Sequence, residues 1–122
     1  MENMNVKSNN VANATVFVNL TPHDVVFNDG RVFKAVSYNK DDAARVSTAF
    51  TDPENDVCHV TYGAIDNLPE PRDGVKYIVS GMVLAAAKAM GRTDCVAPAT
   101  GRRDTVRTAD NKGIISVKCF VD

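Results

Sequence analysis

The stretch Val75–Pro98, VKYIVSGMVLAAAKAMGRTDCVAP, decides the fold because a strand pattern in it leads directly into a helix pattern. Residues 75–79 are rich in β-branched and aromatic side chains and predict a strand. Ser80 can accept a hydrogen bond from an amide of a first helical turn, so a helix is expected over 81–90. Gly91 suits the left-handed conformation that ends many helices.

The predicted helix is apolar on almost every side. Lys88 is its only charged residue, and its alanines allow neighbouring backbone to approach closely. A helix that is apolar all round is usually buried. We therefore expect an α+β fold, in which a mostly antiparallel β-sheet or partial barrel with hairpins packs on one buried helix at about 81–90.

The rest of the chain has the alternation and turn signals of short strands and hairpins. The clearest turn is Asn28-Asp29-Gly30, because Asp-Gly can adopt the positive φ angles of a tight hairpin. Residues 66–74 contain two prolines and a glycine and predict a loop. The further predicted strands are Thr15–Leu20, Val25–Phe27, Arg31–Val36, Ala44–Phe50, Val57–Ile65, Cys95–Ala97, Thr105–Thr108 and Ile114–Val121.

The length of 122 residues is that of a single domain. Residues 1–14 are Asn-rich and hold few large apolar groups, so we expect a flexible N-terminal tail followed by one α+β domain over 15–122. No apolar run approaches the roughly 20 residues that cross a bilayer, and no signal-peptide pattern opens the chain. These features predict a cytoplasmic protein without membrane contact.

The three cysteines, Cys58, Cys95 and Cys119, are odd in number and widely separated. They form no CxxC pair, so the sequence predicts neither a disulfide framework nor a zinc site. We expect reduced, buried thiols that act as small hydrophobic side chains.

Charge is unevenly distributed along the chain. From Lys88 to the end there are seven basic and four acidic residues, a balance of plus three, and the remainder holds seven basic and eleven acidic residues, a balance of minus four. This asymmetry favours an anionic ligand near the C-terminal third if the arginines converge in space. The alternative is that these charges are scattered and solvated. Nucleic-acid binding is not expected, because no binding motif and no pronounced basic excess is present.

The segment Thr21-Pro22-His23 interrupts a strand pattern with a hydroxyl and an imidazole. The imidazole titrates near neutrality and could act as a general base or as a ligand-binding donor. Alternatively, Thr21 and His23 satisfy backbone groups that the proline leaves exposed. The second histidine, His59, stands alone on a predicted strand, so no metal site is expected.

Two further candidate sites flank the predicted helix. Ser80 is most simply its N-cap, although the free amides that follow Ser80 could also receive a phosphate or carboxylate. Catalysis by Ser80 is not expected, because YIVSG lacks the first glycine of a nucleophile elbow. Beyond the helix, Arg92 and Asp94 form either a local ion pair or one border of a site.

The loop over residues 99–104, ATGRRD, carries two guanidinium groups on a small, flexible segment. Guanidinium groups suit phosphate or nucleotide recognition, although a solvated loop is the alternative. Arg45 is a further polar residue that could join a common concave surface. The predicted ligand-binding residues are therefore Thr21, His23, Arg45, Ser80, Arg92, Asp94, Thr100, Arg102 and Arg103.

The order and spacing of several motifs resemble one family of small proteins. The motifs are VNLTPHDVVF, ARVS, TYGAIDNLPEP, VKYIVSGMVLAAA, RTDCVAPA and DNKGIISVKCF. They are similar to those of proteins from tailed bacteriophages and prophages that open with Asn-Leu-Thr-Pro-His. This chain departs from that pattern in its alanine-rich residues 85–88 and in the arginine pair after Gly101. The resemblance implies a viral protein expressed in the bacterial cytoplasm, but it brings no activity with it.

The sequence predicts a non-enzymatic phage accessory protein that binds a small anionic or nucleotide-like ligand and could thereby sequester a host defence signal. The second interpretation is a protein-interaction or virion-associated module that acts on a host or phage protein. The third is a small hydrolase or transferase that uses His23 as a base. We expect no cofactor, and we expect a homo-oligomer because free strand edges favour self-association.

Overall fold

The computed structural model of the protein describes residues 15–122, and the predicted N-terminal tail lies outside them. This part of the chain holds short strands, one 3-10 helix and one α-helix. The elements are β1 (Val16–Asn19), β2 (Val25–Val26), β3 (Val32–Phe33), η2 (Lys40–Asp42), β4 (Arg45–Phe50), β5 (Val60–Asp66), β6 (Val75–Ile78), α1 (Gly81–Ala89), β7 (Cys95–Pro98), β8 (Val106–Arg107), β9 (Ile114–Ser116) and β10 (Phe120–Val121).

The central sheet has four strands in the order β1-β6-β7-β10. Strand β6 pairs in parallel with both β1 and β7, and only β10 joins β7 antiparallel. The prediction of a mostly antiparallel sheet is therefore wrong for the centre of the fold. The reason is the helix: α1 carries the chain from the end of β6 back to the start of β7, and a crossover of this kind makes its two strands parallel.

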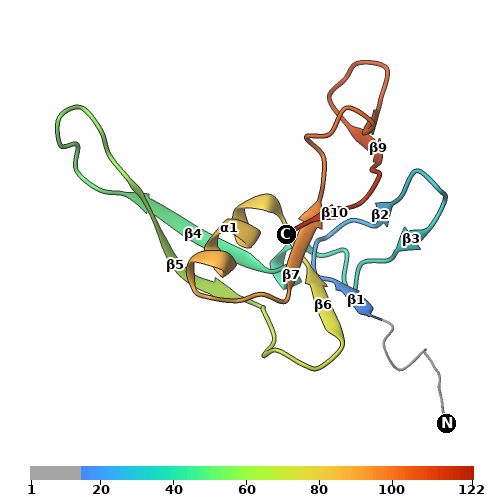
Figure 1. Ribbon diagram of the computed structural model, residues 1–122, viewed down its shortest axis with the longest axis horizontal. Coiled ribbons are helices and arrows are strands. Elements are labelled where there is room, and N and C mark those ends of the chain that lie inside the picture. The colour runs from blue at the N-terminus through green and yellow to red at the C-terminus, as the bar shows by residue number, and fades with distance from the viewer. Residues whose placement is uncertain (1–14) are drawn as a thin grey trace, which may run out of the picture.

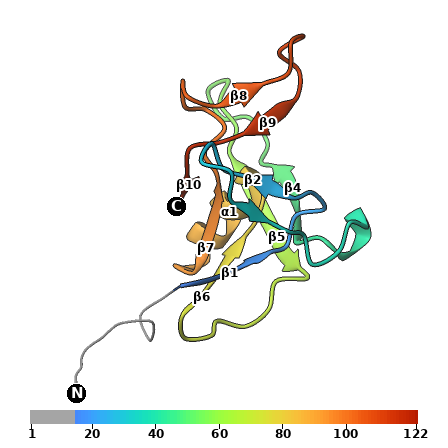
Figure 2. The same cartoon turned by 90° about the vertical axis from the view of Figure 1, so that its right-hand side faces the viewer.

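The central sheet is covered on both faces. Side chains alternate along its strands, so Tyr77 and Cys95 pack with α1 on one face, whereas Ile78 and Val96 pack on the other. The second face is covered by the β2–β3 hairpin and by a cluster of four phenylalanines, whose neighbouring ring centroids lie 4.7 to 5.6 Å apart. The cluster consists of Phe17, Phe27, Phe33 and Phe120. Figures 1 and 2 show α1 and the hairpin on either side of the sheet.

The helix is buried on one face only, which corrects the expectation of a buried helix. Its buried residues are Val83, Leu84, Ala86 and Ala87. Met82 is 58% exposed on the opposite face. The apolar pattern overstated burial because a single helix on one face of a sheet has no second layer to cover its outer side. The start at Ser80 and the left-handed glycine after the helix are as predicted.

The remaining strands form three separate hairpins rather than a barrel. Within residues 15–122 the pairs β2–β3, β4–β5 and β8–β9 are two-stranded sheets, and no closed barrel forms. The strand predicted over Ile114–Val121 is wrong as a single element, because β9 pairs with β8 and β10 leaves to pair with β7. The α+β class holds, with most strands in small sheets around one helix.

The cysteines differ from the prediction of three buried thiols. Cys95 is buried in the core, whereas Cys119 is half-buried and Cys58 is exposed between β4 and β5. His59 also lies outside the strands, so its predicted place on a strand is wrong.

In the part of the chain described, α1 is the only α-helix, and no helix has the length and apolar character needed to span a membrane.

Candidate functional site

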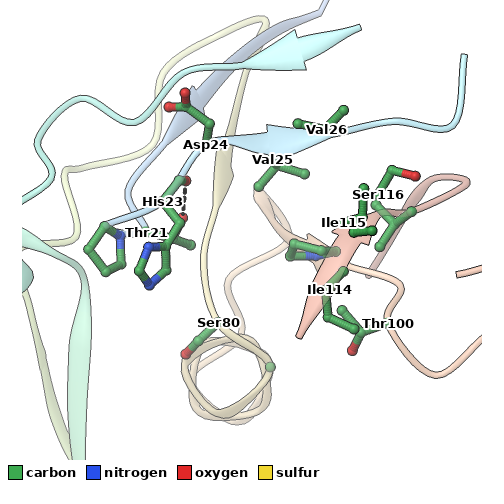
Figure 3. A pocket seen from close by; sticks show the side chains of 14 residues that line it. Thr21, His23, Asp24, Val25, Val26, Ser80, Thr100, Ile114, Ile115 and Ser116 are labelled. Carbon is green, nitrogen blue, oxygen red and sulfur yellow. Dashed lines mark hydrogen bonds between the residues drawn. The ribbon is translucent and has the colours of Figure 1, made fainter. Parts of the chain in front are cut away.

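A groove of about 550 Å³ opens where four distant segments meet. It lies between the loop after β1, the start of α1, the end of β7 and strand β9 (Figure 3). The lining residues are Thr21, Pro22, His23, Asp24, Val25, Val26, Ser80, Gly81, Pro98, Thr100, Ile114, Ile115, Ser116 and Val117. Its volume falls in the range of small-molecule sites, which is roughly 300 to 1,000 Å³.

The loop on one side of the groove is held by Asn19, the last residue of β1. Asn19 is only 2% exposed, and its amide nitrogen donates to the carbonyl oxygens of His23 and Phe33, each at 2.8 Å. Its carbonyl oxygen accepts from the amide of Thr21 at 3.0 Å and from the Thr21 hydroxyl at 2.7 Å. Asn19 thus satisfies the backbone groups that Pro22 would otherwise leave without partners.

Thr21 and His23 differ in what their side chains do. The Thr21 hydroxyl lies within hydrogen-bond distance of Asn19 and of the His23 carbonyl, so it serves the loop itself. The imidazole of His23 is exposed and makes no hydrogen bond with another described residue. It also has no described partner that would orient it as a general base needs. The imidazole is therefore available to a molecule in the groove.

The start of α1 forms the opposite edge of the groove. The Ser80 side chain accepts a hydrogen bond from the amide of Val83 at 3.2 Å, which makes Ser80 the N-cap. The amides of Gly81 and Met82 have no partner within the helix, because the first amides of any helix lack one. The helix dipole adds partial positive charge at this end. In Figure 3 the helix is seen nearly end-on, with Ser80 below His23.

The wall facing His23 is apolar. Ile114 and Ile115 are 42% and 54% exposed, which is unusual for such large side chains, and both line the groove with Pro98. Thr100 adds a hydroxyl that makes no hydrogen bond with another described residue. Figure 3 shows Ile114 and Thr100 together, across the groove from His23. A molecule bound here would meet an apolar wall on one side and polar groups on the other.

Charge within the groove is low. Its only formal charge is Asp24, whose carboxylate accepts from the amide of Ala35 at 2.9 Å and from the hydroxyl of Tyr38 at 2.7 Å. These bonds hold the pKa of Asp24 below its ordinary value, the Ala35 amide contributing most, and the carboxylate in turn raises the pKa of Tyr38. Asp24 therefore supports the loop, and no lysine or arginine lines the groove.

The structure brings together four of the predicted site residues and separates the others. Thr21, His23, Ser80 and Thr100 line the groove. Arg45 lies at the start of β4, where it faces Asp41 at 3.9 Å. Arg102 pairs with Asp104 through two hydrogen bonds of 3.0 Å, and Arg103 is exposed on the same loop.

Arg92 and Asp94 lie beyond the far end of α1, where Arg92 lines a smaller hollow of about 260 Å³. Their side chains are joined by hydrogen bonds of 2.8 and 2.9 Å, and Arg92 also donates to the Pro69 carbonyl at 2.8 Å. The bond from Arg92 lowers the pKa of Asp94, and Asp94 raises the pKa of Arg92. Both guanidinium and carboxylate groups are thus engaged in fixing the loop. The helix between Ser80 and Arg92, Gly81–Ala89, is about 12 Å long by the rise of 1.5 Å per residue, so the two residues lie at opposite ends of it.

Three groups in and under the groove were missed by sequence reasoning. Asn19 could have been found, because a polar residue at an inward position of the alternating strand TVFVNL must find partners when buried. Ile114 and Ile115 carried no signal, since two adjacent apolar residues in a strand fit a core equally well. The residues 15–122 contain no cluster of three His, Cys, Asp or Glu side chains placed to hold a metal ion.

Comparisons with known proteins add no identity to this site. No protein-family model, no curated protein and no solved structure matches the chain.

Proposed function

We propose that the protein binds a small anionic or nucleotide-like ligand in the groove and acts by holding it rather than by transforming it. The observation that carries the proposal is the convergence of Thr21, His23, Ser80 and Thr100 from separate segments on one groove of ligand size. Such convergence of a few polar groups on an apolar concavity is typical of small-molecule sites.

The groove suits a ligand with two unlike parts. A flat apolar or aromatic ring would pack against Ile114, Ile115 and Pro98. A single anionic group would face the imidazole of His23 and the free amides at the start of α1, where the helix dipole favours negative charge. Since no arginine or lysine lines the groove, a ligand with one or two negative charges fits better than a polyphosphate.

The resemblance to phage proteins gives this binding a use. A phage protein that holds a nucleotide-like molecule in an infected cell lowers its free concentration, and so weakens a host defence that depends on such a signal. This role requires that the protein binds the ligand tightly, and it does not require that the protein catalyses a reaction of the ligand.

The test is calorimetric titration of the full chain with inorganic phosphate, nucleoside monophosphates, cyclic mononucleotides and cyclic dinucleotides. We expect at least one nucleotide to bind with a dissociation constant below about 1 mM and inorganic phosphate to bind more weakly, because phosphate lacks the part that packs on the apolar wall. Ile115→Glu, which places a negative charge on the apolar wall from an exposed position, should abolish binding of an anionic ligand, and His23→Ala should weaken it.

The matched control is Arg102→Ala together with Arg103→Ala. These arginines lie on the loop outside the groove lining, so their loss should leave binding within about threefold of the wild type. Binding that is lost in this control but survives Ile115→Glu would move the site to the arginine loop. No binding by any nucleotide below about 1 mM would end the proposal.

The two alternative functions predict different outcomes. A module that acts on a host or phage protein should retain such a protein specifically from infected cells, and it should bind none of the titrated nucleotides. A hydrolase or transferase should turn over one of the titrated compounds, detected by phosphorus NMR, and should lose that turnover in His23→Ala.

A further inference from the structure

The hairpin of β4 and β5, here called the arm, projects away from the rest of the protein (Figure 1). At its base, Val46 and Ile65 pack against the core beside α1. Beyond the base, every residue from 47 to 64 is exposed. Two-stranded hairpins that no other layer covers are marginally stable in water. The arm therefore has the character of a segment that packs on another molecule.

One face of the arm is apolar. In the strand register Phe50 lies opposite Val60 and Thr48 lies opposite Tyr62. Because side chains alternate between the faces of a strand, these four share one face. Phe50 is 72% exposed, Val60 44% and Tyr62 36%.

The tip of the arm is acidic. Asp52, Glu54 and Asp56 lie in the turn between the strands, and residues 46–65 contain no lysine or arginine, so this segment has a formal charge of minus three. None of the three carboxylates forms an ion pair with another residue of the described range. A partner for the arm should thus combine exposed apolar side chains with positive charge.

The chain itself carries a surface that combines positive charge with exposed apolar side chains. It consists of β8, β9 and the loop before them, residues 100–118, and is here called the basic hairpin. This segment holds five basic residues, Arg102, Arg103, Arg107, Lys112 and Lys118, and two acidic ones, Asp104 and Asp110, a formal charge of plus three. It also exposes the large side chains of Ile114 and Ile115. In Figure 1 the arm and the basic hairpin extend from different sides of the body, so the arm does not reach the basic hairpin of its own chain.

We propose that the arm of one copy packs on the basic hairpin of a second copy. Because adjacent side chains of β9 point to opposite faces, the apolar face of the arm covers the more exposed of the two isoleucines, Ile115, and the acidic tip lies beside Arg103 and Lys112. Two copies can exchange arms reciprocally, which closes a two-fold dimer and leaves no arm free. Arms placed tip to tip would instead bring six carboxylates together, an arrangement that like-charge repulsion disfavours.

The exchanged arm also changes the groove. Ile115 belongs to the groove lining as well as to the basic hairpin, so an arm that covers this side chain narrows the apolar wall and leaves Ile114 and Pro98 to a ligand. The dimer is tested without any ligand, so its failure in sedimentation and the failure of the proposed function in calorimetry are separate results.

A charge swap tests the interface by sedimentation equilibrium of the full chain. One variant carries Asp52→Lys and Glu54→Lys, and the other carries Arg103→Glu and Lys112→Glu; all four positions are exposed. We expect the wild type to form a dimer with a dissociation constant of about 100 μM, which is in the range of a modest interface. Each variant alone should dimerise at least about tenfold more weakly.

The decisive measurement is made on a mixture of the two variants. In the mixed dimer each lysine-bearing tip meets a glutamate-bearing hairpin, and each wild-type tip meets a wild-type hairpin, so both contacts regain opposite charges. We expect the mixture to dimerise within about threefold of the wild-type affinity. The control is Lys34→Glu with Arg72→Glu, two exposed residues outside both surfaces. It changes the net charge by the same amount as Arg103→Glu with Lys112→Glu, and it should leave the affinity unchanged.

Three outcomes would overturn the proposal. The wild type could remain a monomer at about 500 μM, far above the concentration at which a useful interface forms. Both charge-swapped variants could dimerise as tightly as the wild type. This result would place the interface elsewhere, for example along paired arm strands. The variants could also fail to recover on mixing while their circular dichroism and melting temperatures match the wild type.

Discussion

Replacement of Asn19 by alanine tests the support of the groove most sharply. Asn19 is 2% exposed and makes four hydrogen bonds, two as donor and two as acceptor. In Asn19→Ala the carbonyl of Phe33 loses its Asn19 donor and the amide of Thr21 loses its acceptor, whereas the His23 carbonyl can still accept from the Thr21 hydroxyl at 2.9 Å. Each group left without a partner costs about 1 kcal/mol or more, so the variant should lose about 2 kcal/mol of unfolding free energy. This is a large share of the roughly 5 to 15 kcal/mol that stabilise a domain.

The assay is urea unfolding followed by far-ultraviolet circular dichroism, because the chain has no tryptophan to report by fluorescence. Asn39→Ala is the control: Asn39 is exposed and caps only the short helix η2, so its loss should cost about 0.5 to 1 kcal/mol. Asn19→Asp should be as damaging as Asn19→Ala at neutral pH, since it replaces the donor with a carboxylate oxygen that faces two carbonyls. A loss below about 1 kcal/mol in both Asn19 variants would refute this role.

Two further predictions concern the ends of α1. Ser80→Ala removes the acceptor for the amide of Val83 and should cost about 1 kcal/mol in urea unfolding, whereas Ser80→Asp, which can still cap, should cost less. Asp94→Asn should cost about 1 to 2 kcal/mol at pH 7, because it breaks the pair with Arg92, whose side chain is 17% exposed. Arg92 holds the pKa of Asp94 below its ordinary value of 3.8, so the contribution of the pair is complete above the unfolded pKa and is lost as pH falls through the folded one. Urea unfolding should therefore show a constant difference between wild type and Asp94→Asn above about pH 5 that shrinks below about pH 4. A difference that stays the same between about pH 4 and pH 2 would contradict the assignment.

The sequence was sufficient for local structure but not for how the elements meet. Ser80, the apolar run and Gly91 predicted α1 to within one residue, because caps and left-handed glycines act through neighbouring backbone groups. The parallel pairing of β6 with β1 and β7 depends on residues about 60 and 20 positions away along the chain, and no local pattern records it.

The same limit applies to the groove. Thr21, His23, Ser80 and Thr100 were each identified from an interruption in a local pattern, and the fold brings them together. The arginines were chosen for their chemistry, but each of Arg45, Arg92 and Arg102 lies beside a nearby aspartate. The pairs of Arg92 and Arg102 join residues two apart, and such short-range partners could have been weighed more heavily from the sequence alone.

The most direct test of the proposed function is to map ligand contacts by two-dimensional NMR of the nitrogen-15-labelled chain. The titrants are inorganic phosphate, adenosine, adenosine monophosphate and a cyclic dinucleotide. If the groove is the binding site, a nucleotide should shift the amide resonances of Gly81, Thr100 and Ile115 while those of Arg45 and Arg92 stay in place, and adenosine should shift the Gly81 amide less than its monophosphate does. Shifts that gather around Arg92 or Arg102, or no shift with any titrant at about 1 mM, would contradict the proposal.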